Sequence, residues 1–147
     1  ADLEHSAIKE YIESISEKKS SHKFIIIKED MSHIFDINKV LSNNEVICFT
    51  GDRYFQGNKL LKANFLGKEA HFPAGPFMIA SRLGVPVIFV YVMKEKNLHY
   101  HLYACTANTK HRDAQGLLNA YIQNMEQMVK KYPLQWFNFF DFWEEKE

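Results

Sequence analysis

Apolar residues recur with two different spacings along this chain, and these spacings predict its elements. An apolar repeat of three to four residues, typical of amphipathic helices, occupies residues 3–18, 32–42 and 114–132. Short continuous apolar runs, typical of strands buried on both faces, occupy residues 24–27, 46–50 and 85–92. Strands of that kind usually lie in parallel sheets that are covered by helices. The pattern therefore predicts an α/β fold with a mixed, mostly parallel sheet flanked by helices.

The segment before the last apolar run predicts a turn followed by a short helix. Phe72-Pro73-Ala74-Gly75-Pro76 is interpreted as a turn, because proline fixes φ and Gly75 can adopt a φ closed to other residues. Residues 77–83 are expected to form the helix, which ends near Gly84. The strand over residues 85–92 would follow directly.

The remaining segments complete this expected order. Residues 60–65 alternate weakly and are compatible with an edge strand or an extended loop. A polar turn over residues 94–97 leads to an alternating segment, 99–104, which we expect to pair antiparallel with residues 85–93. A last short helix is expected over residues 133–143.

Composition narrows the class of protein. A chain of 147 residues with 46% hydrophobic residues and a formal net charge of zero predicts one folded domain, not a disordered or nucleic-acid-binding chain. The longest apolar run is far shorter than the roughly 20 residues that span a bilayer. Cys48 and Cys105 lie in apolar segments and are expected to be buried, unbridged thiols. Aromatic residues crowd positions 136–143, where packing is favoured over membrane contact because acidic residues accompany them.

Two short stretches are candidates for binding chemistry. Asp52 and Arg53 follow the expected strand 46–50, and ligands of open α/β sheets bind beyond the carboxyl ends of strands. Arg53 could hold an anion through two hydrogen bonds, with Asp52 orienting it or binding a hydroxyl; a plain salt bridge between neighbours is the alternative. Phe72, Pro73 and Gly75 either bring backbone close to a substrate or only aim the next helix.

No metal or cofactor site is predicted. His99 and His101 share one face of an expected strand, but no third ligand is evident. The chain contains no zinc-binding cysteine–histidine spacing, phosphate-binding glycine-rich loop or Gly-x-Ser-x-Gly motif.

The order and spacing of several motifs resemble those of a known family. The motifs are Phe65-Leu66-Gly67, Phe72-Pro73-Ala74-Gly75-Pro76 and Gly84-Val85-Pro86-Val87-Ile88-Phe89-Val90, with Gly51-Asp52-Arg53 upstream and Tyr132-Pro133-Leu134-Gln135-Trp136-Phe137 downstream. Together they resemble the bacterial lipid A biosynthesis (lauroyl/myristoyl-type) acyltransferases of the glycerolipid acyltransferase superfamily, and the resemblance covers most of the chain.

The resemblance implies transfer of a fatty acyl chain to a lipid acceptor, such as a lipid A precursor or a lysophospholipid. The donor would be a thioester of acyl carrier protein or coenzyme A. No cofactor and no nucleic-acid partner are expected. The resemblance also implies a bacterial, membrane-associated protein that is peripheral on the cytoplasmic side of the inner membrane, and this segment of it is expected to be soluble. An arginine near the position of Arg53 would hold a phosphate of donor or acceptor. A non-catalytic lipid- or anion-binding module of the same fold is the alternative.

The family uses a histidine followed, after four residues, by aspartate or glutamate, the histidine acting as general base. His5 and Glu10 match this spacing, but we interpret the match as a coincidence. Residues five positions apart on a regular helix are rotated by about 140° from each other and do not meet. The chain is therefore expected to be the C-terminal portion of an acyltransferase, a single α/β domain over residues 1–147. Its catalytic pair would lie in a missing N-terminal segment before Ala1, and the chain alone would be inactive.

Overall fold

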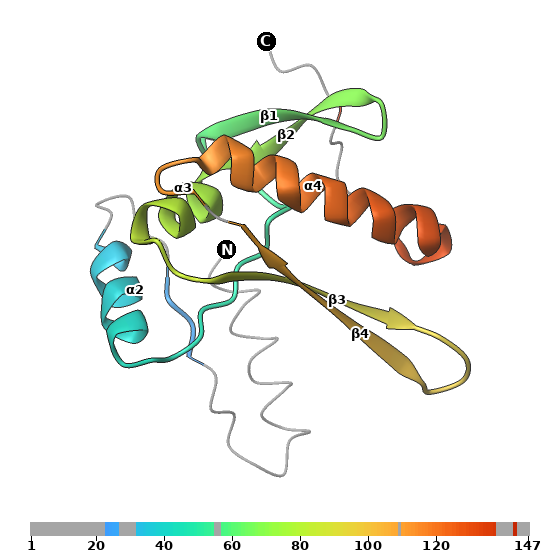
Figure 1. The fold of residues 1–147 in the computed structure, drawn as a ribbon, viewed down its shortest axis with the longest axis horizontal. Coiled ribbons are helices and arrows are strands. Elements are labelled where there is room, and N and C mark those ends of the chain that lie inside the picture. Colours follow the sequence, from blue (N-terminus) through green and yellow to red (C-terminus); the bar gives the residue numbers. More distant parts are fainter. Residues whose placement is uncertain (1–22, 27–31, 55–56, 109, 138–142, 144–147) are drawn as a thin grey trace. The chain divides into compact units, whose positions relative to one another are not determined.

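The computed structural model describes residues 23–26, 32–54, 57–108, 110–137 and 143. The chain divides into two compact units, Ala1–Cys48 and Phe49–Glu147. Figure 1 labels the helices and strands of both units. The expected helix over residues 3–18, together with His5 and Glu10, lies outside the described residues.

The first unit contains helix α2, His33–Ser42. Its apolar stripe buries Ile37, and the helix ends at Asn43, as the sequence predicts. The expected buried strands at 24–27 and 46–50 are wrong as far as the structure describes them, because residues 24–26 and 46–50 are not in strands. Phe24, Ile26 and Val46 are exposed. An apolar run shows strand propensity, whereas a strand also needs a partner, which a local pattern cannot supply.

In the described residues of the second unit, two hairpins and two helices follow in the order β1 Leu60–Phe65, β2 Lys68–Pro73, α3 Ala74–Leu83, β3 Val87–Lys94, β4 Tyr100–Ala107 and α4 Ala114–Lys131. A 3₁₀ turn, Pro133–Gln135, follows. β1 pairs antiparallel with β2, and β3 pairs antiparallel with β4. The α/β class is confirmed, but within the described residues no strands pair in parallel, so the expected mostly parallel sheet is not found there.

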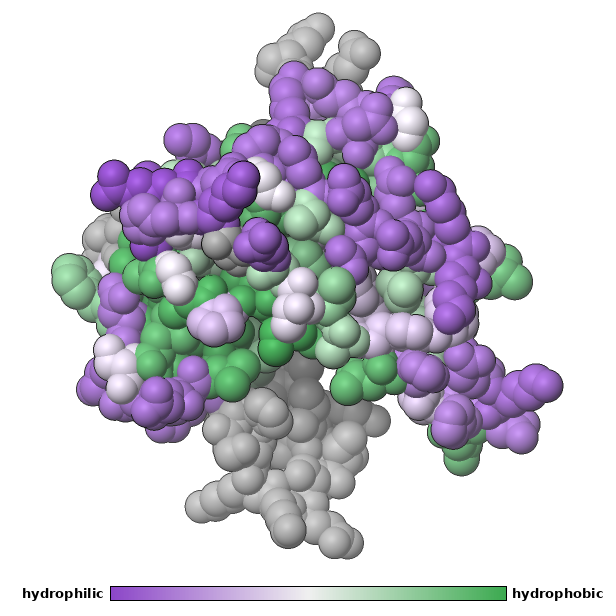
Figure 2. Space-filling view, viewed as in Figure 1, coloured by the Kyte–Doolittle hydropathy of each residue, from purple (hydrophilic) through white to green (hydrophobic). Residues whose placement is uncertain are grey.

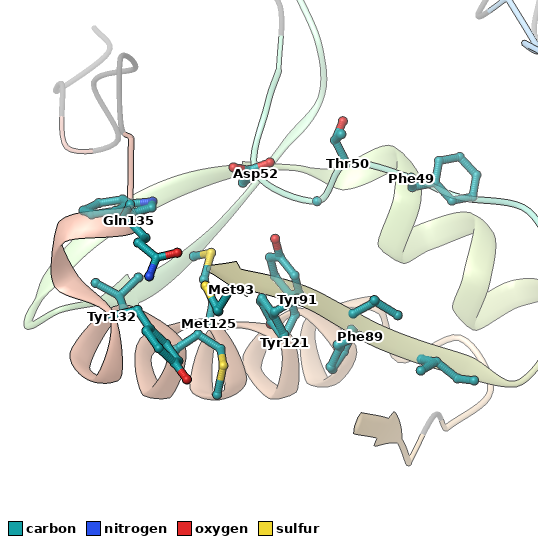
Figure 3. A pocket seen from close by; sticks show the side chains of 16 residues that line it. Phe49, Thr50, Asp52, Phe89, Tyr91, Met93, Tyr121, Met125, Tyr132 and Gln135 are labelled. Atoms are coloured by element: carbon teal, nitrogen blue, oxygen red, sulfur yellow. The ribbon is translucent and has the colours of Figure 1, made fainter. Parts of the chain in front are cut away.

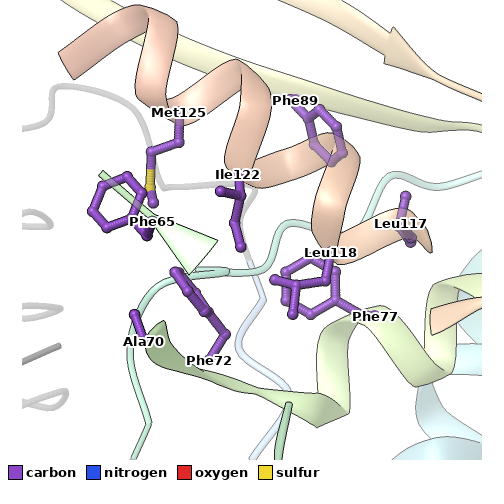
Figure 4. Packing of buried hydrophobic residues seen from close by; sticks show 9 residues of the cluster. All are labelled: Phe65, Ala70, Phe72, Phe77, Phe89, Leu117, Leu118, Ile122 and Met125. Atoms are coloured by element: carbon purple, nitrogen blue, oxygen red, sulfur yellow. The ribbon is translucent and has the colours of Figure 1, made fainter. Parts of the chain in front are cut away.

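Helix α4 is the central element of this unit, since α3, β1, β3 and β4 all contact it. Its start is capped by Asp113, whose Oδ1 accepts a hydrogen bond from the Gly116 N–H at 2.8 Å. The buried core gathers aromatic residues from the hairpins around the inner face of α4 (Figure 4). Its members are Phe65, Ala70, Phe72, Phe77, Phe89, Leu117, Leu118, Ile122 and Met125. Hydrophilic side chains cover much of the face that α4 presents in Figure 2.

Strand β3, Val87–Lys94, lies two residues further along the chain than predicted, and it differs from its prediction mainly in burial. Phe89 is 7% exposed, whereas Ile88, Val90 and Val92 on the other face are 55–58% exposed. The strand is therefore buried on one face only. Its neighbour β4 and the turn between them are confirmed, with the Glu95 N–H donating to the His99 carbonyl at 2.8 Å.

The segment 72–76 is not a turn. Phe72 and Pro73 end β2, and Ala74 begins α3, which is longer than expected at its N-terminus. Gly75 is helical and has no positive φ; the left-handed glycine is Gly84, which ends α3 at φ +63°. Of the expected helix 133–143, the structure describes a 3₁₀ turn over Pro133–Gln135, after which Trp136 and Phe137 have no helical structure.

Both cysteines are free thiols, as expected, but exposed, not buried. Within the described residues, no helix is both long and apolar enough to cross a membrane.

Candidate functional site

A cavity of about 350 Å³ lies between β3, α4 and the loop of residues 49–52 (Figure 3). The inward face of β3 and one face of α4 form opposite walls. Alternation along β3 directs Phe89, Tyr91 and Met93 to the same side. The corresponding residues of α4 are Tyr121, Met125, Met128 and Val129.

Most of the cavity wall is apolar and adaptable. Met93, Met125, Met128, Val129 and Trp136 line it together with Phe89. Methionine side chains are flexible and polarizable, so they fit apolar ligands of varying shape. The walls suit a hydrocarbon better than a polar metabolite.

Polar groups gather where the loop of residues 50–52 meets the two walls. Figure 3 shows Tyr91 and Tyr121 close to the loop that carries Thr50 and Asp52. The Tyr91 hydroxyl is buried and has no hydrogen-bond partner among the described residues. A buried polar group without a partner destabilises a fold, and an unfilled binding site is one explanation for it.

Both phenols are held in the protonated state. Burial raises the pKa of Tyr91, to which nearby Cys105 and Asp52 add smaller contributions. Burial likewise raises the pKa of Tyr121, and the Asp52 carboxylate raises it further. Both hydroxyls therefore remain hydrogen-bond donors at physiological pH. In the described part of the chain, Asp52 is the only carboxylate that lines the cavity.

Gly51 explains how the loop approaches the helix. A Cβ at this position would lie 3.0 Å from Cζ of Tyr121, so the backbone of the loop packs directly on the phenol. Phe77 and Phe89 hold the same ring, with centroid distances of 5.6 Å and 5.3 Å. The glycine of Gly51-Asp52-Arg53 thus sets the distance between Asp52 and α4.

The sequence-based candidates fall into two groups. Arg53 adjoins the cavity through Asp52: its guanidinium lies 3.1 Å from the Asp52 carboxylate, and its side chain is 40% exposed. Phe72 and Pro73 are buried in β2, and Gly75 is exposed at the start of α3. None of these three residues lines the cavity.

The motif Tyr132–Phe137, which follows α4, contributes Tyr132, Gln135 and Trp136 to one end of the cavity. Gln135 pairs with the backbone of Lys94, accepting its N–H at 2.8 Å and donating to its carbonyl at 2.7 Å. The Tyr132 hydroxyl donates to Glu95 at 2.6 Å, and Trp136 packs edge-on against Phe65. The three hydrogen bonds fasten the segment at the end of α4 to the β3–β4 hairpin, and Trp136 ties the same segment to β1.

Sequence reasoning missed Tyr91 and Tyr121 as site residues. The available signal was a phenol inside an otherwise apolar pattern, because a buried tyrosine usually needs a partner for its hydroxyl. Of the described histidines, none lines the cavity. His101 instead stacks on Tyr103 at 4.2 Å, and in the described ranges no three metal-binding side chains come together.

Residues 11–145 match the family model described as bacterial lipid A biosynthesis acyltransferase. No curated protein and no solved structure matches the chain.

Proposed function

The chain belongs to the bacterial lipid A biosynthesis acyltransferases, and from this premise we propose that the cavity between β3 and α4 holds the fatty acyl chain during transfer. The acyl group would come from a thioester of acyl carrier protein or coenzyme A. It would pass to a hydroxyl or amine of a lipid acceptor such as a lipid A precursor or a lysophospholipid. The protein would work at the cytoplasmic side of the inner membrane.

The observation that carries this proposal is the polarity of the cavity. An acyl thioester has a long hydrocarbon tail and one polar carbonyl, and the cavity has apolar walls with hydrogen-bonding groups at the loop of residues 50–52. Each buried methylene contributes about 0.8 kcal/mol, so six methylenes would contribute about 5 kcal/mol. The protonated hydroxyls of Tyr91 and Tyr121 can donate to the carbonyl oxygen.

Arg53 is proposed to bind a phosphate group of donor or acceptor. Its present ion pair with Asp52 is partly exposed, and such pairs contribute about 0–1 kcal/mol. A hydrogen bond between guanidinium and phosphate contributes about 1.5–3 kcal/mol and can be bidentate. Loss of the Asp52 pair would therefore cost little when Arg53 binds a phosphate. Asp52 would then be available to accept a hydrogen bond from the acceptor.

The remaining candidates are assigned a supporting role. Phe72 and Pro73 lie in the core where β2 passes into α3, and Gly75 presents exposed backbone there. This junction would support the cavity through core packing and would not contact the substrate itself. No described histidine lines the cavity, so the proposal assigns acyl binding to it and leaves proton transfer to other residues.

The proposal is tested by filling the cavity. Met128 lines it from α4, whereas Gln127, the residue immediately before it, is exposed on the same helix. Met128→Trp is expected to weaken binding of a fluorescent fourteen-carbon acyl probe by roughly tenfold or more, equivalent to about 1.4 kcal/mol. An eight-carbon probe should lose less, since it fills less of the cavity.

Gln127→Trp is the matched control and should bind both probes as the wild type does. Thermal unfolding of both variants establishes that the helix is intact. Equal affinity of Met128→Trp and Gln127→Trp for the long probe would place the acyl chain elsewhere.

A further inference from the structure

A second hollow, of about 510 Å³, lies where the end of α3 meets the start of α4. Met78, Ser81 and Arg82 of α3 line one side, and His111, Arg112 and Ala114 line the other. It shares no lining residue with the first cavity. The acyl-binding proposal therefore leaves this hollow without a role.

The hollow is lined by basic groups that have no acidic counterpart there. Neither Arg82, His111 nor Arg112 forms an ion pair with any residue that the structure describes. The neighbouring Asp113 does not line the hollow, and its carboxylate accepts the Gly116 N–H at the start of α4. Two guanidinium groups beside one concavity repel each other, and an anion between them would reverse that repulsion.

The backbone holds Arg112 in this position at a cost. Arg112 has φ +59°, a left-handed conformation that costs a non-glycine residue on the order of 1 kcal/mol. Its N–H donates to the Ser81 carbonyl at 3.0 Å, and Ser81 is 1% exposed. This bond ties the loop before α4 to the last turn of α3 and so places Arg112 near Arg82.

Glycine would meet the backbone requirement without strain, so the arginine side chain is the feature that needs a reason. We propose that this hollow binds a phosphate monoester or diphosphate group. The planar guanidinium fork matches phosphate oxygens in a bidentate geometry, and two such groups on separate elements can hold one phosphate from both sides. The site is separate from Arg53 and from the acyl cavity.

The sharpest test is Arg112→Gly in the full chain. This substitution removes the guanidinium and relieves the left-handed strain, so the unfolding temperature should stay the same or rise. Binding of inorganic pyrophosphate, measured by calorimetry, should weaken by roughly tenfold or more, as for the loss of a charge-assisted hydrogen bond. Arg82→Gln should have a similar effect, and Arg112→Lys should keep part of the affinity.

Lys59→Gln serves as the control, because Lys59 is exposed and lines neither cavity. Coenzyme A and vesicles with phosphatidic acid distinguish the source of the phosphate, with phosphatidylcholine vesicles as the blank. Weaker binding of coenzyme A in Arg112→Gly would identify the acyl donor as the source of the phosphate. Weaker binding of the phosphatidic acid vesicles would identify the lipid. The proposal is overturned if Arg112→Gly and Arg82→Gln bind all three phosphate probes as Lys59→Gln does, or if the wild type binds none.

Discussion

At the scale of single residues, the Tyr91 hydroxyl should affect both the stability of the free protein and its binding of the proposed acyl ligand. Its hydroxyl is buried and has no partner among the described residues, which costs about 1–3 kcal/mol of unfolding free energy. Tyr91→Phe should therefore stabilise the free protein by roughly 1 kcal/mol, measured by urea unfolding, while weakening binding of the acyl probe. Tyr100→Phe, at an exposed position of β4, should change neither quantity. A loss of stability in Tyr91→Phe would mean that its hydroxyl already has a partner.

Glu126 makes stability depend on pH. Its Oε1 accepts the Leu66 N–H at 2.7 Å, and its Oε2 accepts from Lys130 at 3.1 Å. The bond from Leu66 is the larger cause that lowers the Glu126 pKa below its ordinary 4.5, and Lys130 lowers it further. A lowered folded pKa means that the stabilisation is complete above about pH 4.5 and is lost as pH falls through the folded pKa.

Glu126→Gln should accordingly be less stable than the wild type at pH 7, with the difference shrinking on acidification to pH 3. Urea midpoints of both proteins across this range measure the effect. A difference that stays constant with pH would show that the carboxylate charge contributes nothing.

The polar end of the cavity, formed by Asp52, Tyr91 and Tyr121, shows the limits of residue-level prediction. Asp52 and Arg53 were identifiable because charged residues after an apolar run have few structural reasons to be there. Tyr91 and Tyr121 lie in the apolar patterns 85–92 and 114–132, and a sequence does not show whether a phenol within such a pattern finds a partner. Only the packing of Gly51 against Tyr121 brings these groups together.

At the scale of elements, the turn of the β1–β2 hairpin holds a leucine in a strained backbone conformation that a substitution can relieve. Its two turn residues, Leu66 and Gly67, have φ of +53° and +87°, the signs that a type I′ turn requires. Asparagine tolerates this conformation better than leucine, and Leu66 is partly exposed. Leu66→Asn should raise the unfolding free energy by roughly 0.5–1 kcal/mol. Leu66→Ala keeps the strain and should give no gain; equal or greater stabilisation by alanine would exclude this explanation.

Elements with a local signal were predictable, and elements that depend on a distant partner were not. Helices α2 and α4 begin and end within a residue or two of their apolar repeats. Strand β2 was missed because its last residues, Phe72 and Pro73, resemble a turn, although pairing with β1 extends them. The one-sided burial of β3 depends on α4, which no local pattern of residues 85–92 can reveal.

At the scale of the whole molecule, α4 links stability and binding within the unit Phe49–Glu147. Leu118 and Ile122 face the core, while Tyr121 and Met128 line the cavity proposed to hold the acyl chain. A ligand in this cavity should therefore stabilise the unit, by about 2.7 kcal/mol at a concentration 100 times its dissociation constant. A phosphate bound in the basic hollow at the α3–α4 junction should stabilise the unit separately, because the two sites share no lining residue.

The most direct measurement is photo-crosslinking with a fatty acyl probe that carries a diazirine near the end of its chain. The account predicts that label is incorporated at Met125, Met128, Val129 or Trp136, residues of the cavity wall. Unlabelled fatty acid should compete, and Met128→Trp should reduce labelling of this wall. Label that is displaced by competitor but located only on residues outside this wall would contradict an acyl chain in this cavity.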